Sequence, residues 1–138
     1  CVMAGSDIVA LDATGRPRLD GLSFAQTVAA LREDSTLVMA DCGSFEDAQR
    51  AVDAGVDIVS TTLAGYTGDR VKTDGPDLEL LREVVAAFPD VPVICEGRVH
   101  TPEQAAAAVE AGAFAVIVGT AITHPTSITT WFKAAVEG

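Results

Sequence analysis

Polar side chains that could move a proton or hold a sugar stand at the ends of apolar segments in this chain. Asp12, Asp41, Thr62 and Glu96 each follow a short apolar run. A carboxylate can remove a proton from a substrate and return it, provided that a second group stabilises the charge that develops. Glutamate is a poor N-cap and a poor turn former, so a structural role explains Glu96 less well than it explains the aspartates. Glu96 is therefore the leading catalytic candidate.

Two glycine-containing segments could bind an anion. Gly97 and Arg98 follow the apolar run 93–95, and Gly119 and Thr120 follow the run 113–118. Small residues after a strand let backbone N–H groups approach a phosphate, as they do after strands seven and eight of many eight-stranded barrels. Glycine is also frequent after strands for turn geometry alone. Phosphate binding and a plain turn are both compatible with these residues.

Metal and acyl-transfer sites find little support in the sequence. His100 and His124 are separated from each other and from the cysteines, without metal-ligand spacing. No serine stands in a nucleophile elbow. The three cysteines are odd in number, and free thiols in the cytosol are the expected state. We therefore expect no metal and a cytoplasmic protein.

The composition limits the partners and the size of the fold. Twenty acidic residues against nine basic ones give a net charge of −11, which disfavours nucleic acid and anionic membrane surfaces. No segment approaches the roughly 20 apolar residues that a membrane span needs. With 138 residues, 49% of them hydrophobic, residues 1–138 are expected to form a single domain with its own core.

The elements that must position the polar residues alternate between strand and helix five times. Strands are predicted at 7–11, 36–40, 56–61, 93–95 and 113–118, and helices at 24–32, 45–54, 77–88, 102–111 and about 127–136. Ser23 with Gln26, and Thr101 with Gln104, have the spacing of capping boxes. The strands are apolar almost throughout, which is typical of a parallel sheet buried on both faces.

Two α/β architectures accommodate this pattern. An Ala-Gly pair precedes an apolar strand at Gly5, Gly55 and Gly112, at intervals of 50 and then 57 residues. Each interval holds two strand–helix units, close to a quarter of a (β/α)₈ barrel. Five units do not close an eight-stranded barrel. The chain is expected to be either an open doubly wound sheet or about five units of a TIM barrel.

Taken together, these segments resemble the N-acylglucosamine-6-phosphate 2-epimerase family. The matching segments lie in family order along the chain: 8–14 with Arg16 and Arg18, 38–41, 57–67, 93–98 with Thr101 and Pro102, and 118–123 with Pro125. The Thr-Thr-Leu-Ala-Gly-Tyr-Thr run of 61–67 and the Glu-Gly-Arg run of 96–98 are the most specific parts of the resemblance.

The resemblance implies a TIM (β/α)₈ barrel to which this chain contributes strands four to eight, as one partial-barrel domain without strands one to three. It implies an isomerase of amino-sugar and sialic-acid catabolism that works without a redox cofactor. Such an enzyme interconverts N-acetylmannosamine 6-phosphate and N-acetylglucosamine 6-phosphate by removing and returning the proton at C2. Glu96 would act with a lysine at the end of strand two, outside these 138 residues. The chain alone is then expected to be inactive, and either to self-associate, for example as a homo-oligomer, or to be only partly ordered.

The same resemblance assigns the remaining site residues. It implies that Asp12 holds the sugar, that the phosphate contacts Gly97, Arg98, Gly119 and Thr120, and that Asp41, Thr62 and Tyr66 line the mouth. His124 stands where the family usually has a substrate-binding arginine, so an imidazole replaces a permanent positive charge.

Three other functions stay open. A non-catalytic sugar-phosphate-binding module would keep the Glu-Gly-Arg and Gly-Thr segments for their shape. A synthase or a metal-dependent pentose-phosphate epimerase would share the phosphate loops, although the latter needs strand-end metal ligands that these strands lack. A purely structural half-barrel would bind nothing.

Overall fold

In the computed structural model, which describes all 138 residues, the chain forms five consecutive strand–helix units. The strands are β1 (Ile8–Asp12), β2 (Leu37–Asp41), β3 (Ile58–Ser60), β4 (Val93–Glu96) and β5 (Ala115–Ile117). The helices between them are α1 (Phe24–Glu33), α2 (Phe45–Asp53), α3 (Leu78–Ala87) and α4 (Pro102–Glu110). A 3₁₀ helix (Val2–Ala4) precedes β1, and α5 (Thr120–Thr123) and α6 (Pro125–Glu137) follow β5.

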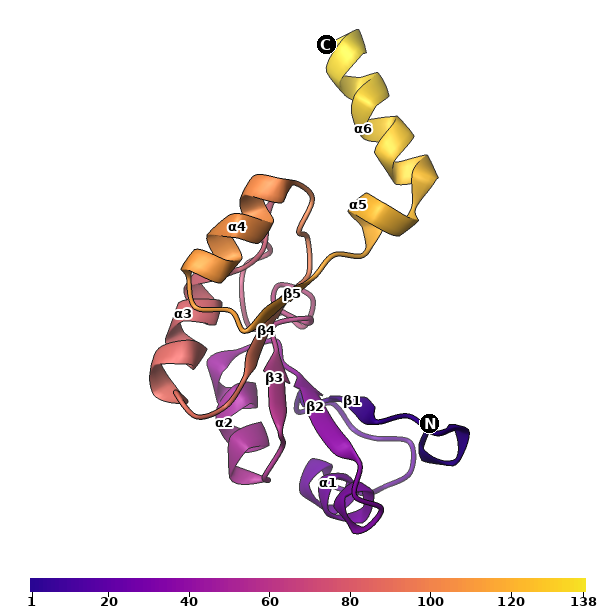
Figure 1. The fold of residues 1–138 in the computed structure, drawn as a ribbon, viewed down its shortest axis with the longest axis vertical. Coiled ribbons are helices and arrows are strands. Elements are labelled where there is room, and N and C mark those ends of the chain that lie inside the picture. The colour runs from indigo at the N-terminus through magenta and orange to yellow at the C-terminus, as the bar shows by residue number, and fades with distance from the viewer.

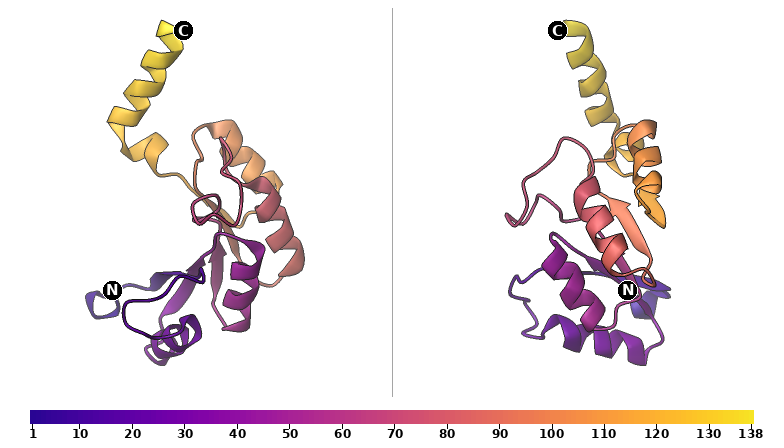
Figure 2. Two further views of the ribbon diagram at one scale, coloured as in Figure 1. Left: turned by 180° about the vertical axis from the view of Figure 1, so that it is seen from behind. Right: turned by 90° about the vertical axis from the view of Figure 1, so that its left-hand side faces the viewer.

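The strand order separates the two architectures. All neighbouring strands are parallel, and the order across the sheet is β1-β2-β3-β4-β5. A doubly wound sheet reverses its strand order at a switch point, whereas a barrel adds each strand beside the one before it. The sheet is curved, and α1 to α4 lie along one side of it (Figures 1 and 2). The chain is therefore α/β, with five consecutive β/α units of a TIM barrel.

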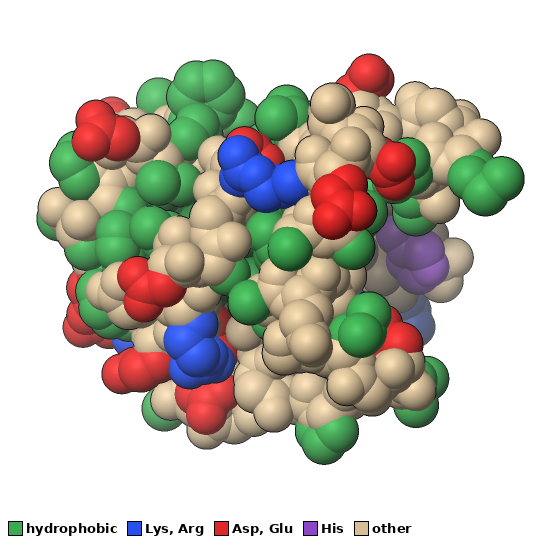
Figure 3. All heavy atoms as spheres, turned by 90° about the horizontal axis from the view of Figure 1, so that it is seen from below, with side chains coloured by type: hydrophobic (Ala, Val, Ile, Leu, Met, Phe, Trp, Pro, Cys, Tyr) green, Lys and Arg blue, Asp and Glu red, His purple; other side chains and the backbone are tan.

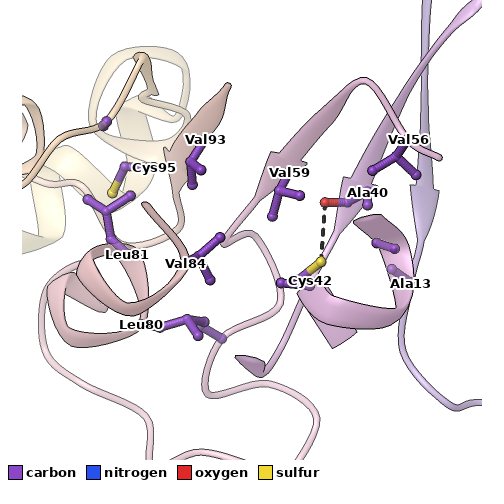
Figure 4. Packing of buried hydrophobic residues seen from close by; sticks show 14 of the residues in the cluster. Ala13, Ala40, Cys42, Val56, Val59, Leu80, Leu81, Val84, Val93 and Cys95 are labelled. Atoms are coloured by element: carbon purple, nitrogen blue, oxygen red, sulfur yellow. Dashed lines mark hydrogen bonds between the residues drawn. The ribbon is translucent and has the colours of Figure 1, made fainter. Parts of the chain in front are cut away.

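The hydrophobic core lies between the sheet and these helices. Ala40 and Val59 point from the strands toward the helices (Figure 4). Together with Val38 they are fully buried and pack in one cluster with Leu80 and Leu81 of α3. Complete burial of a valine or leucine side chain contributes about 1.5–3 kcal/mol. This layer is what holds the strand ends in register.

The opposite face of the sheet is partly exposed, so the prediction of strands buried on both faces was wrong. Ile8 and Leu37 are paired in the sheet, and each retains 45% of its side-chain exposure. The helices cover only one face, and five strands do not enclose an interior.

Hydrophobic side chains also gather on part of the surface seen from below (Figure 3). Whether the chain self-associates through such surface, and whether residues 1–138 act as one domain, stay predictions.

Local sequence signals account for most helix boundaries. The capping boxes of Ser23 with Gln26 and of Thr101 with Gln104 are both formed, which confirms the predicted starts of α1 and α4. β3 and β5 are three residues each, shorter than predicted. After β5 the chain passes Gly119 and enters the short helix α5, which the sequence analysis did not predict.

The carboxyl-terminal helix stands away from the sheet. α6 begins at Pro125, two residues earlier than predicted, and none of its residues is buried. It extends from the body of the molecule in every view (Figures 1 and 2). Its one aromatic contact joins the rings of Trp131 and His100, whose centroids are 4.8 Å apart. No helix in the chain combines the length and apolarity that crossing a membrane requires.

Candidate active site

The polar residues predicted at strand ends do meet at one edge of the sheet. Asp12, Asp41 and Glu96 are the last residues of β1, β2 and β4, and Thr62 lies two residues after β3. Asp12 is in register with Asp41, and Asp41 with Ser60. Because parallel strands present their carboxyl ends at the same edge, this convergence follows from the fold.

Glu96 is held by two hydroxyl groups from the neighbouring strand. Its Oε2 atom lies 2.7 Å from Thr62 Oγ1 and 3.2 Å from Ser60 Oγ. The two hydroxyl oxygens are themselves 2.5 Å apart, and Thr62 Oγ1 lies 3.2 Å from Oδ1 of Asp41. The Glu96 and Asp41 carboxyl groups are thus joined through hydroxyl groups rather than by direct contact.

The backbone of Glu96 is fixed separately. Thr61 Oγ1 accepts a hydrogen bond from the Glu96 amide and donates one to its carbonyl, each at 3.1 Å. Thr61 is 2% exposed, so water does not substitute for these bonds. The exit of β3 therefore orients both the main chain and the side chain of Glu96.

Asp41 is the carboxyl group of this edge whose pKa rises. Burial is the largest influence and raises the pKa of Asp41 to about 6; the hydrogen bond from Thr62 opposes the rise, and the charges of Glu96 and Asp12 add to it. A carboxyl group with a pKa of about 6 is mostly charged at neutral pH but keeps a protonated fraction of about a tenth at pH 7. Asp41 is therefore protonated more readily than an ordinary aspartate.

The pKa of Asp12, in contrast, is lowered. Burial acts to raise the pKa of Asp12, but hydrogen bonds from the Thr14 hydroxyl and amide and the charge of Arg16 outweigh it, so the pKa lies below its usual value. Oδ1 of Asp12 accepts from Thr14 Oγ1 at 2.6 Å and from Thr14 N at 2.9 Å, and Arg16 Nη2 lies 2.5 Å from Oδ2. Asp12 is therefore a stably charged acceptor.

A pocket of about 260 Å³ opens beside Glu96. Its lining includes seven of the ten residues predicted for the site: Thr62, Tyr66, Glu96, Gly97, Arg98, Gly119 and Thr120. Gly97 has φ of +102°, a conformation that glycine adopts readily and other residues rarely do. The predicted carboxylate and the two predicted phosphate segments thus border one cavity.

Arg98 holds the long loop between β3 and α3 against the pocket. Its guanidinium donates to the carbonyls of Ala64 at 2.7 Å and Gly75 at 3.0 Å, and to Thr73 Oγ1 at 3.0 Å. It also lies over the Tyr66 ring, 5.1 Å from the centroid. A guanidinium has five N–H donors, so these three bonds leave two for a ligand.

Three predicted site residues do not line this pocket. Asp41 reaches it only through Thr62, and Asp12 lies beside Asp41 in the sheet. His124 is the N-cap of α6, where its Nδ1 lies 2.8 Å from Ser127 Oγ and accepts from Ser127 N at 3.4 Å. The assignment of His124 as a substrate contact stays a prediction.

Sequence reasoning missed several residues at this site. Ser60 contacts Glu96 and Thr61 fixes its backbone. The pocket lining also includes Val99, His100 and Ile117. Ser60 could have been found from its pattern, since it is a polar residue in an apolar strand and stands two positions before Thr62, on the same face. No group of three or more His, Cys, Asp or Glu side chains is arranged to hold a metal ion.

Comparison with known proteins gives consistent similarities. The sequence profile of the family described as "Putative N-acetylmannosamine-6-phosphate epimerase" matches residues 1–138. A relative from Cutibacterium acnes named "Putative N-acetylmannosamine-6-phosphate 2-epimerase" is 58% identical, over 99% of this chain and 61% of its own length. A relative of the same name from Corynebacterium glutamicum is 49% identical, over 95% of this chain and 56% of its own length.

The solved structures agree in fold. The N-acetylmannosamine-6-phosphate 2-epimerase from Clostridium perfringens superposes with a TM-score of 0.89 at 42% identity, over 94% of this chain and 56% of that one. FabK from Thermotoga maritima, as its M276A mutant, superposes with a TM-score of 0.66 at 26% identity, over 88% of this chain and 37% of that one. This chain spans about three fifths of the length of the curated relatives that it matches.

Proposed function

Since this chain belongs to the N-acetylmannosamine-6-phosphate epimerase family, we propose that it forms the strand-four to strand-eight part of an isomerase. The reaction would interconvert N-acetylmannosamine 6-phosphate and N-acetylglucosamine 6-phosphate in amino-sugar catabolism. The observation that supports this most is the single pocket shared by Glu96, the 97–98 segment and the 119–120 segment.

In this proposal Glu96 exchanges the proton at C2 of the sugar. The C2 proton becomes acidic only when charge that develops on the neighbouring oxygen is stabilised, so the reaction needs a second group across the substrate. The pocket lining contains no lysine, and the chain has only Lys72 and Lys133. We assign the second group to a lysine outside these 138 residues, so the chain by itself does not turn over.

The remaining residues would bind and orient the substrate. The backbone N–H groups of Gly97 and Gly119, with the two unused N–H groups of Arg98, would take the phosphate. Asp12, charged and fixed by Arg16, would accept hydrogen bonds from sugar hydroxyls. Tyr66 would cover one side of the pocket. Because the net charge of −11 repels an anion at long range, such local donors must supply the affinity.

A second function is favoured by the lack of a lysine in the pocket. A sugar-phosphate-binding module would use the same phosphate donors and never exchange the C2 proton. Both functions predict that N-acetylglucosamine 6-phosphate binds the complete protein, so binding alone does not distinguish them.

Deuterium incorporation at C2 tests the proposal. N-acetylmannosamine 6-phosphate would be incubated in heavy water with this chain and with the chain joined to the amino-terminal strands of the Cutibacterium acnes relative, and followed by NMR. We expect deuteration with the extended protein only. Binding without exchange by a folded extended protein would favour the binding module and overturn the epimerase assignment.

A further inference from the structure

The Ser60 and Thr62 hydroxyl groups, which lie between Asp41 and Glu96, make more polar contacts than they have hydrogens to donate. Ser60 and Thr62 have one hydroxyl hydrogen each. Four oxygen–oxygen contacts nevertheless connect them to each other and to the two carboxyl groups. When both carboxyl groups are charged, neither supplies a hydrogen, so only two of the four contacts are hydrogen bonds at any moment.

Among the arrangements that the two hydrogens allow, two differ in which carboxyl group receives the Thr62 hydrogen. In the first, Ser60 donates to Thr62 at 2.5 Å and Thr62 donates to Glu96 at 2.7 Å. In the second, Ser60 donates to Glu96 and Thr62 donates to Asp41, both at 3.2 Å. The shorter distances favour the first arrangement at rest, so Asp41 receives the Thr62 hydrogen only when the second arrangement forms.

We propose that Ser60 and Thr62 are positioning residues that couple Asp41 to Glu96. The Thr62 hydrogen is shared between the two carboxyl groups, mainly with Glu96, while Glu96 is charged, and it is donated to Asp41 when Glu96 holds a proton. The change requires only rotation about the two C–O bonds, and no covalent bond forms or breaks. The coupling can exist without turnover, and its catalytic meaning rests on the proposed function. During the reaction, the proton that Glu96 takes from C2 would free the Thr62 hydrogen to stabilise the Asp41 charge.

The surroundings of Asp41 support this assignment. The charged groups that face it are Glu96 from β4 and Asp12 from β1, whose charge is partly balanced by Arg16. Ser60 is fully buried, so bulk water does not readily replace its hydroxyl. Burial raises the pKa of Asp41 to about 6, the Thr62 hydrogen bond lowers it, and Glu96 raises it. Removal of either neighbour should therefore move the titration of Asp41 in a defined direction.

Carboxyl ¹³C NMR titration of the 138-residue chain with labelled aspartate tests the coupling. Thr62→Val removes this shared hydrogen at nearly constant shape and should raise the Asp41 midpoint by up to about one pH unit. Thr62→Ser restores a hydroxyl and should return the midpoint toward the original value. Glu96→Gln removes a negative charge and should lower the midpoint. Thr130→Val, on the exposed α6, is the matched control and should leave it in place.

Ser60→Ala provides a second variant in case Thr62→Val does not fold, which circular dichroism would reveal. Without Ser60, Glu96 has Thr62 as its one hydroxyl donor and holds that hydrogen more firmly, so the Asp41 midpoint should rise by about half a pH unit. A midpoint that stays in place in folded Thr62→Val, or in folded Ser60→Ala, would overturn the coupling. A shifted midpoint combined with no C2 exchange in the extended protein would retain the coupling and remove the epimerase function.

Discussion

Replacement of Arg98 by lysine should destabilise the protein although the charge is kept. The guanidinium binds three acceptors in the loop between β3 and α3 and stacks on Tyr66. A lysine ammonium has no planar fork and cannot meet these acceptors together. The Ala64 residue is 1% exposed, and its carbonyl has no other hydrogen-bond donor in the structure. It would therefore be left unsatisfied in the variant.

The expected loss is about 2–3 kcal/mol in the free energy of unfolding. An unsatisfied buried carbonyl costs about 1–3 kcal/mol, and the contact with the Tyr66 ring adds about 0.5–1 kcal/mol at a partly exposed site. Arg98 has φ of +57°, which lysine shares at the same cost, so backbone strain cancels in the comparison. Water reaching Thr73, on the exposed side of the loop, limits the loss from the third bond.

Urea unfolding followed by circular dichroism measures this difference. Arg82→Lys is the matched control, because Arg82 lies exposed on α3 and makes only a 3.4 Å contact with Leu78 O; it should change stability by less than about 0.5 kcal/mol. A loss of unfolding free energy in Arg98→Lys as small as that in Arg82→Lys, with an unchanged slope of that free energy against urea concentration, would show that Arg98 does not fix the loop. That result would refute the reasoning.

Three further predictions concern the same edge of the sheet. Folding raises the pKa of Asp41, so the stability that Asp41 contributes is present at low pH and is lost as the pH rises through about 6. The original chain should therefore lose stability between about pH 5 and about pH 8. In urea unfolding, Asp41→Asn should make that loss smaller by about 1 kcal/mol, a figure already discounted for solvent screening. Gly65 and Gly68 both have positive φ, at +76° and +92°. A Cβ added at Gly65 would lie 2.7 Å from the Lys72 backbone, whereas one added at Gly68 would contact nothing. Gly65→Ala should therefore lower the thermal midpoint clearly more than Gly68→Ala. Thr61→Val should leave the Glu96 amide without its partner and raise its hydrogen-exchange rate at least about tenfold, while a rate equal to that of the original chain would contradict the role given to Thr61.

Features that depend on nearby residues were predictable from the sequence. The two capping boxes, at Ser23 and Thr101, link residues three apart and formed as expected. The convergence of Asp12, Asp41 and Glu96 at one edge also followed, because any parallel sheet brings its carboxyl strand ends together. Composition and spacing were compatible with both a doubly wound sheet and a barrel. The observed strand order decided between the two.

Features that depend on distant partners were not predictable. The contact of Ser60 with Glu96 joins residues 36 positions apart, and no local pattern encodes the rotamers that bring them together. The expectation for Arg98 concerned phosphate alone, and its bonds to the preceding loop add a structural role. The short helix α5, which begins directly after Gly119, was not predicted. His124 was considered as a metal ligand and as a substrate contact but not as an N-cap, although its position before Pro125 and Ser127 suits that role.

The central claim is that Glu96 exchanges the C2 proton from the shared pocket. It is tested most directly by Glu96→Gln in the extended protein, with C2 deuteration of N-acetylmannosamine 6-phosphate followed by proton NMR and binding followed by phosphorus NMR in the same sample. The account predicts that deuteration falls at least about a thousandfold while the bound phosphorus signal persists. Deuteration at the original rate by the folded Glu96→Gln protein would contradict it.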